Sequence, residues 1–226
     1  MRWFVTGDTH GRLDRIYSWI ERMNFDSEDI NVIIAGDAGI CWRKDGRDMD
    51  AAIRKHEQYK FHLWFIDGNH ENFDILDSLP KDENGIVNLC NNLHYITRGS
   101  VIKFNNKTIL CCGGADSIDR GFRTPHLNWW AQEQVTEEDI KKCLSGDNYY
   151  DYIITHCCPY SVFYKYTPSL VTIPWLDQSK IDHTSEHMLD AVAASIQCES
   201  WIFGHYHVDI DLDSRYRCIL NDFLEL

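Results

Sequence analysis

Five short apolar runs in this chain are each followed by residues that commonly bind metals, and this arrangement limits the possible folds more than any other feature. The runs are Trp3–Val5, Val32–Ala35, Leu63–Ile66, Tyr152–Ile154 and Trp201–Phe203. Continuous apolar runs of this length are typical of buried strands. In open α/β sheets, ligands bind beyond the carboxyl ends of the strands, which is where these polar residues stand. The pattern therefore predicts an α/β fold with one functional edge.

The segments between the runs support this prediction. Helical spacing of apolar residues over Leu13–Met23 and an amphipathic stretch over Asp48–Tyr59 separate the first three runs, which gives the order β-α-β-α-β of a parallel sheet. After Pro80 the strands follow one another closely, which predicts a second, more antiparallel sheet. The further elements expected are strands at Leu93–Ile96, Val101–Phe104 and Thr108–Cys112, a hairpin turn at Asn105-Asn106, helices from Thr136 to Leu144 and from Ser185 to Ile196, and a closing hairpin of Val208–Leu212 with Tyr216–Leu220.

The polar residues after the runs form a set of carboxylates, imidazoles and one amide. This mixture of donors suits divalent metals, with manganese preferred and iron or zinc as alternatives. Seven ligands are too many for one tetrahedral ion and suit two ions. The predicted ligands are Asp8, His10, Asp37, Asn69, His156, His205 and His207.

Two ions need a shared ligand, and a carboxylate is the natural choice. Asp37 stands among glycines at the end of a run and is the predicted bridge. A pair of metals about 3.5–4 Å apart can hold a hydroxide between them and clamp a phosphoryl group for in-line displacement. The ligand set therefore points to metal-dependent hydrolysis of phosphoesters.

Composition limits the partners and the compartment. At 226 residues the chain fits one domain, so we expect residues 1–226 to form a single unit. A net charge of −13 argues against stable nucleic-acid binding and against attachment to a membrane surface. The nine cysteines show no CxxC spacing, and the first strand is expected almost at the N-terminus, without a signal segment. These features predict a cytoplasmic protein without a membrane span.

The polar motifs also resemble a known family. Asp8-x-His10, Gly36-Asp37, Gly68-Asn69-His70-Glu71, His156 and Gly204-His205-x-His207 match, in order, the five signature blocks of the calcineurin-like metallophosphoesterases. The resemblance implies a four-layer αββα sandwich of two mixed β-sheets flanked by helices, with a dinuclear metal centre. It assigns one ion to Asp8, His10, Asp37 and His207, and the other to Asp37, Asn69, His156 and His205. It implies catalytic roles for Asp37, at the bridge, and for His70, which faces the substrate and assists the leaving oxygen.

The resemblance to one branch, the serine/threonine protein phosphatases, is partial. In that branch the Gly-Asp block continues into an aspartate and a phosphate-binding arginine, where this chain has Ile40 and Cys41. The phosphate contact is therefore expected from another arginine, and the candidates are Arg43, Arg120 and Arg123.

The expected function is hydrolysis of a phosphomonoester, with a phosphorylated small molecule or protein as substrate. Two alternatives stay open at this stage. One is hydrolysis of a phosphodiester or nucleotide, and the other is a catalytically silent scaffold. The scaffold is disfavoured because no ligand is missing. The oligomeric state is left open.

Overall fold

The apolar runs form the central strands of two six-stranded sheets in the computed structural model, which describes residues 1–25, 27–171 and 181–226. The first sheet contains, in spatial order, β12 (Leu224–Glu225), β1 (Arg2–Thr6), β2 (Ile30–Ile34), β3 (His62–Ile66), β5 (Leu93–Ile96) and β4 (Ile86–Cys90). The second contains β10 (Ile210–Asp211), β11 (Tyr216–Cys218), β9 (Gln197–Phe203), β8 (Tyr149–Thr155), β7 (Lys107–Cys112) and β6 (Ser100–Phe104). The inner strands of each sheet are parallel and the edge strands are antiparallel, so both sheets are mixed.

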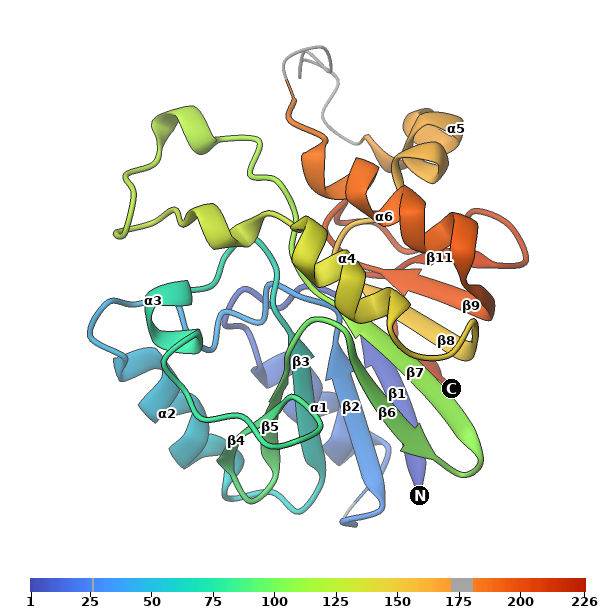
Figure 1. Cartoon of the computed structure of the whole chain (residues 1–226). Coiled ribbons are helices and arrows are strands. Elements are labelled where there is room, and N and C mark those ends of the chain that lie inside the picture. The colour runs from blue at the N-terminus through green and yellow to red at the C-terminus, as the bar shows by residue number, and fades with distance from the viewer. Residues whose placement is uncertain (26, 172–180) are drawn as a thin grey trace.

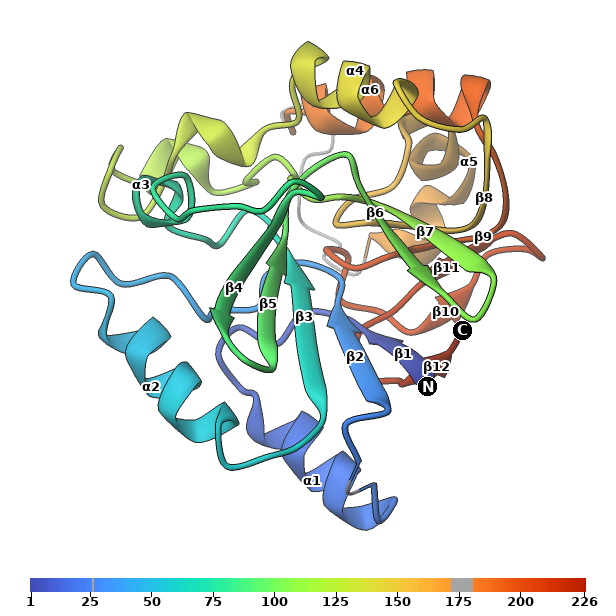
Figure 2. The same ribbon diagram turned by 60° about the horizontal axis from the view of Figure 1, so that its bottom comes forward.

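The helices cover the outer faces of the two sheets (Figures 1 and 2). On the side of the first sheet lie α1 (Asp14–Arg22) and α2 (Arg47–His56), with the short α3 (Phe73–Leu76) near its end; on the side of the second lie α4 (Glu137–Leu144), α5 (Tyr160–Leu170) and α6 (Thr184–Ser195). Two 3-10 turns, η1 (Arg120–Phe122) and η2 (Ala131–Glu133), belong to the long segment before α4. This arrangement confirms the predicted αββα sandwich.

The layer between the sheets is apolar because strands buried on both faces need apolar side chains on both. Val5 and Ile33 from the first sheet meet Ile154 and Ile202 from the second in one buried cluster. Separate clusters fill the space between each sheet and its helices. The two sheets are therefore held at a fixed spacing by a shared core.

The predicted second sheet is present, but the expectation that it would be more antiparallel than the first was wrong. The strand β5 belongs to the first sheet, where it runs parallel to β3 with Leu63 opposite Leu93. The second sheet is parallel at its centre. The error arose because β4, α3, α5 and β12 were not predicted. The unpredicted β4 forms an antiparallel pair with β5, and this pair extends the first sheet at its edge.

Several local predictions were correct. Asn105 and Asn106 both have positive φ (45° and 63°), as a tight hairpin between β6 and β7 requires. Thr136 caps α4 through a reciprocal capping box with Asp139. All nine cysteines are free thiols. Among the described residues, we find no helix that is both long and apolar enough to cross a membrane.

Candidate metal centre

The loops after β1, β2, β3, β8 and β9 meet where the carboxyl ends of the inner strands lie. Backbone hydrogen bonds join the first two loops, because Thr9 N and His10 N donate to Asp37 O at 3.1 and 2.8 Å. The first sheet supplies Asp8, His10, Asp37 and Asn69, and the second supplies the three other predicted ligands, so the site lies at the seam between the sheets.

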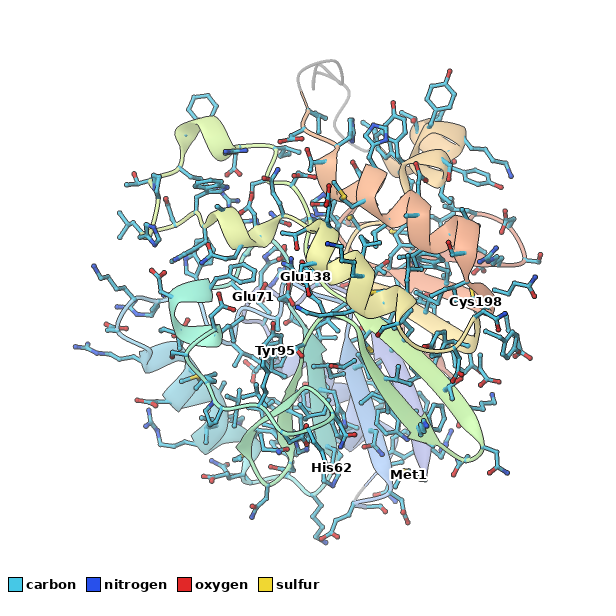
Figure 3. All side chains as sticks on the ribbon, in the orientation of Figure 1. Met1, His62, Glu71, Tyr95, Glu138 and Cys198 are labelled. Carbon is cyan, nitrogen blue, oxygen red and sulfur yellow. The ribbon has the colours of Figure 1, made fainter. Side chains whose placement is uncertain are left out.

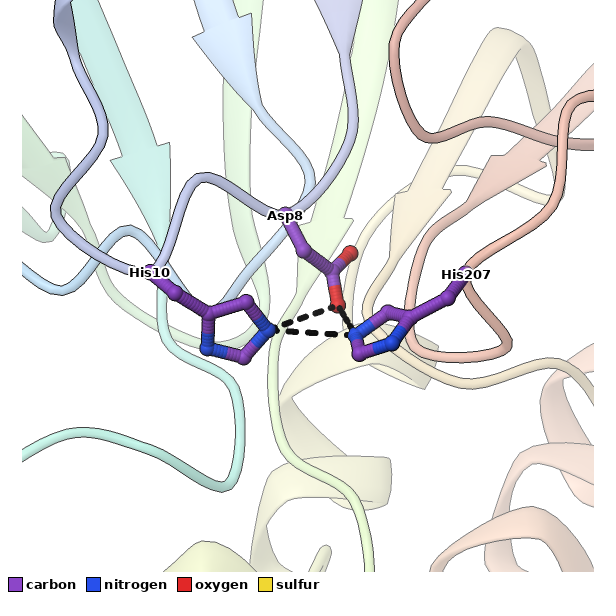
Figure 4. A group of neighbouring side chains, drawn as sticks. All are labelled: Asp8, His10 and His207. Carbon is purple, nitrogen blue, oxygen red and sulfur yellow. Dashed lines mark hydrogen bonds and ion pairs between the residues drawn. The ribbon is translucent and has the colours of Figure 1, made fainter.

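Asp8, His10 and His207 point toward one another (Figure 4). His207 Nε2 lies 3.1 Å from Asp8 Oδ2 and 3.1 Å from His10 Nε2, and His10 Nε2 lies 3.8 Å from the same carboxylate oxygen. Asp8 Oδ1 accepts a hydrogen bond from His205 N at 3.0 Å. The buried Oδ2 accepts no hydrogen bond of good geometry, despite the nearby His207. A buried carboxylate oxygen in this condition, beside two imidazole nitrogens, fits a metal ligand.

The Asp37 carboxylate lies between His10 and His70 on one side and His156 on the other, which is the position expected of a bridging ligand. Its Oδ2 is 3.8 Å from His10 Nε2 and 4.0 Å from His70 Nε2, and its Oδ1 is 3.4 Å from His156 Nε2. Asp8, Asp37 and His156 also form a compact, fully buried set of potential donors. Burial would raise the pKa of Asp37, but the neighbouring histidines, His156 first, hold it well below its usual range. Asp37 is therefore ionised and available to cations.

His156 shows that this part of the site attracts positive charge. Its Nδ1 donates to Ala35 O at 2.8 Å, and its Nε2 lies 3.2 Å from Asn69 Oδ1. Burial would lower the pKa of His156, but Asp37 and Asp8 outweigh burial and raise it to about 10. The carboxylates of Asp37 and Asp8 thus stabilise a positive charge at this ring, as they would stabilise a bound cation. The residues present therefore fit the implied metals.

His205 is poised as a neutral ligand. Its buried ring lies 5.1 Å from that of His156, centroid to centroid. Burial and the adjacent His156 lower its pKa to about 3, so the ring is uncharged at neutral pH. Uncharged imidazole is the form that binds metals.

Four of the predicted ligands have left-handed backbone conformations. The φ angles of His10, Asp37, His205 and His207 are 45°, 49°, 68° and 56°. Such residues cost stability and persist where the surrounding structure over-determines them, commonly at functional sites. The strand-end loops therefore hold these side chains in place before any ligand binds.

The glycines of the motifs leave room for the ligands. A Cβ on Gly36 would overlap the His156 ring, and a Cβ on Gly68 would overlap Asp37. Glycine is therefore needed before Asp37 and before Asn69, because donors from neighbouring strands pack too closely there for a Cβ. Glu71, which is labelled in Figure 3, completes this packing. Its buried carboxylate accepts from Ala38 N at 2.9 Å and from Gly68 N at 2.6 Å. It joins the loops that carry Asp37 and Asn69.

A buried chain of hydrogen bonds behind Asn69 was not predicted from the sequence. Asn69 Nδ2 donates to Ser117 Oγ at 3.1 Å, and Ser117 Oγ donates to Glu133 Oε2 at 2.9 Å. Glu133 Oε1 accepts from Ser117 N at 3.0 Å and from Trp129 Nε1 at 2.8 Å. Burial raises the pKa of Glu133 to about 7. Ser117 and Glu133 lie in a long segment without a motif, so no sequence signal marks them.

His70 lies at the edge of the cluster, in contact with Arg123. Arg123 Nη2 is 2.9 Å from His70 Nε2, its Nη1 donates to Asn69 O at 3.2 Å, and its Nε is 2.7 Å from Asp119 Oδ1. Because a guanidinium only donates, His70 Nε2 is the acceptor in this contact. Burial lowers the pKa of His70; Asp37 opposes this effect and Arg123 adds to it. The Trp42 ring packs on His70 at 5.3 Å.

The other two predicted arginines point elsewhere. Arg120 is half exposed, lies over the Trp129 ring at 4.3 Å and is 3.7 Å from Asp182. Arg43 is exposed and pairs with Asp45 at 3.1 Å. Of the three candidates for phosphate binding, Arg123 is therefore the one that the fold places beside the cluster, with only 6% of its side chain exposed.

Comparison with known protein families gives a match over most of the chain. A protein-family model described as calcineurin-like phosphoesterase matches residues 1–209. A search of curated proteins finds no match to the chain. The matched range contains every predicted ligand, from Asp8 to His207.

Proposed function

Because the chain belongs to the calcineurin-like phosphoesterase family, we propose that it hydrolyses phosphomonoesters with the help of two divalent metal ions, manganese first among them. The observation that supports this proposal best is the convergence of the predicted ligands beside one buried arginine. The ligands supply oxygen and neutral nitrogen donors, and the arginine supplies a fixed positive charge for the phosphoryl group.

The proposed ligands divide as the family resemblance implies. Asp8, His10, Asp37 and His207 would hold one ion, and Asp37, Asn69, His156 and His205 the other. When bound, such ions polarise phosphoryl oxygens and lower the pKa of water, so that it attacks phosphorus at neutral pH.

Arg123 is placed to bind the phosphoryl group. Asp119 anchors its Nε, and the carbonyl of Asn69 anchors its Nη1. The remaining nitrogen, Nη2, has two N–H groups; it now contacts His70, and it can donate to a phosphoryl oxygen while both anchors stay in place. The guanidinium thus offers a charged donor already held in position, which lowers the entropy lost on binding.

His70 is the proposed proton donor to the leaving oxygen. Its Nε2 is released when the imidazole ring turns away from Arg123 toward the leaving oxygen. The negative charge of a bound phosphomonoester raises the pKa of a neighbouring imidazole, which offsets the effect of burial. The protonated ring can then donate to the alkoxide as the P–O bond breaks.

The test uses purified, manganese-loaded protein with p-nitrophenyl phosphate, bis-p-nitrophenyl phosphate and a phosphoserine peptide. We expect monoester hydrolysis that EDTA abolishes, and close to two manganese ions per chain by elemental analysis. Asp8→Asn should lose metal and activity, whereas Asp14→Asn, at an exposed position on α1, should keep both. Faster hydrolysis of the diester would make the protein a phosphodiesterase instead. Full metal loading without any turnover would favour the scaffold.

A further inference from the structure

A cavity of about 290 Å³ adjoins the candidate metal centre. One end is formed by candidate site residues: Asp37, Asn69, His70, Arg123, His205 and His207. The other walls come from the segment before η1, from α5 and from the beginning of α6. The helices α5 and α6 lie next to each other in Figure 1. A molecule whose phosphoryl group reaches the metal ligands would therefore place the rest of its structure against α5 and α6.

The walls far from the ligands are apolar. Ile118, Phe163 and Leu170 line them, together with Val171 and Ile181. The Phe163 ring packs on the rings of His183 and Tyr206, at centroid distances of 4.7 and 5.8 Å. Ile118 is 50% exposed, so apolar surface is open to water beside the catalytic groups. Small-molecule sites combine such apolar walls with a few convergent polar groups.

The polar side chains on these walls already bind one another. Tyr206 Oη donates to Glu186 Oε1 at 2.6 Å, and His183 Nδ1 contacts Glu186 Oε2. Among the described lining residues, Arg123 is the one arginine and there is no lysine. Among the described lining residues at this end, a second phosphate would meet the Glu186 carboxylate, which repels it, and His183, which already pairs with Glu186. The cavity therefore suits a molecule with one phosphoryl group.

The size and the walls also disfavour a phosphorylated peptide. A volume of about 290 Å³ lies at the small end of the ~300–1,000 Å³ typical of small-molecule sites. The side chain of phosphoserine has a single carbon between backbone and oxygen. With its phosphate at the ligands, the peptide backbone would lie close to apolar side chains such as Phe163 and Ile118, which offer its N–H and C=O groups no hydrogen bonds.

We propose that this cavity binds the alcohol portion of the substrate and selects phosphomonoesters of small apolar alcohols, aromatic ones above all. Phosphoserine peptides and nucleoside polyphosphates are the molecules that it rejects. The inference rests on the proposed function, because the metal centre must hold the phosphoryl group for the alcohol to reach these walls.

Binding of non-hydrolysable phosphonates tests the inference without the chemical step. Isothermal titration calorimetry of manganese-loaded protein compares methylphosphonate with benzylphosphonate. We expect benzylphosphonate to bind about tenfold or more tightly, because its ring leaves water for an apolar wall. Phe163→Ala and Ile118→Ser should each bring the ratio of the two affinities toward one and leave methylphosphonate binding unchanged. Ile118→Ser alters an exposed side chain, so it serves even if Phe163→Ala destabilises the fold.

Tyr164→Ala is the matched control, because Tyr164 follows Phe163 on α5 but is 74% exposed and does not line the cavity. This variant should keep the wild-type ratio. Equal affinities for the two phosphonates in the wild type would overturn the inference and leave the proposed function standing. If neither phosphonate binds the metal-loaded protein, both the inference and the proposed function fail.

Discussion

The substitution Glu133→Gln should turn the side-chain amide of Asn69 around. In the native chain, the carboxylate of Glu133 accepts the hydroxyl proton of Ser117, so Ser117 Oγ must accept from Asn69 Nδ2. This leaves Asn69 Oδ1 directed at His156 and the metal site. The donor and acceptor order along these hydrogen bonds is thus set by the Glu133 carboxylate at their far end.

Glutamine reverses this direction. Its oxygen must replace Oε1, which accepts from both Ser117 N and Trp129 Nε1. Its NH2 group then replaces Oε2 and donates to Ser117 Oγ, so the Ser117 hydroxyl must donate to Asn69. Asn69 can accept only through Oδ1, which turns its NH2 group toward the metal site.

The expected loss of metal affinity follows from the free-energy cost of holding Asn69 in its native orientation in the variant. If Asn69 keeps its native orientation, one buried donor has no acceptor, which costs about 1–3 kcal/mol. At about 1.4 kcal/mol per factor of ten, metal binding at this site should weaken about 5- to 150-fold. Substitution of groups that orient metal ligands typically has an effect of about 10–100-fold.

Calorimetric titration with manganese at pH 8, where native Glu133 is ionised, measures this effect. Glu137→Gln, at an exposed position in the first turn of α4, is the matched control and should leave affinity unchanged. Asn69→Asp gives a sharper test, because both of its outer atoms are oxygens. In that background Glu133→Gln should no longer weaken binding. Equal losses in both backgrounds would refute the proposed reversal.

Three further predictions follow from the site and the core. Asp37→Asn should lose metal, whereas His70→Ala should keep metal and lose roughly 10²–10⁴-fold in rate. The loss of rate should be smaller for p-nitrophenyl phosphate than for an alkyl ester, because p-nitrophenolate needs little protonation. Loss of metal from His70→Ala would instead make His70 a ligand. Arg123→Ala should lower kcat/KM by about tenfold or more, while Arg120→Ala, on the outer surface, should change it little; equal losses would contradict the phosphate contact. Burial lowers the pKa of His56 from 6.5 to about 4, so between these values the unfolded chain binds a proton that the native chain does not, and stability falls as pH falls. His56→Gln should remove up to about 3 kcal/mol of this acid destabilisation. Denaturant titrations measure the free energy of unfolding of both proteins across this pH range, and a difference between them that does not vary with pH would contradict the prediction.

The parts of the site that could be predicted are those fixed by a single strand and the loop after it. Val5, Ile33 and Ile202 mark buried strands, and the Gly-Asp and Gly-His motifs after such strands bring donors to one edge. The fold class followed from the same motifs through the family resemblance. The roles of the individual ligands stay predictions until metal is bound.

The parts that could not be predicted depend on contacts between distant segments. Nothing in the spacing of Ser117 and Glu133 indicates that they orient Asn69, because the chain between them is irregular and has no period. Likewise, all four residues of β5 are buried and would fit either sheet, and only the pairing of Leu93 with Leu63 decides between them. The choice of Arg123 over Arg120 rests on the path of one loop.

Because the predicted ligands are divided between the two sheets, the geometry of the candidate metal centre depends on how the sheets pack against each other. Neither sheet carries all seven predicted ligands, so the proposed site forms only when both are in register. The apolar layer that contains Val5, Ile33, Ile154 and Ile202 sets the distance between them. Residues in this layer are not among the predicted ligands, yet their volumes influence how far Asp8 stands from His207. Selection for catalysis would therefore constrain side-chain size deep in the core as closely as it constrains the ligands themselves.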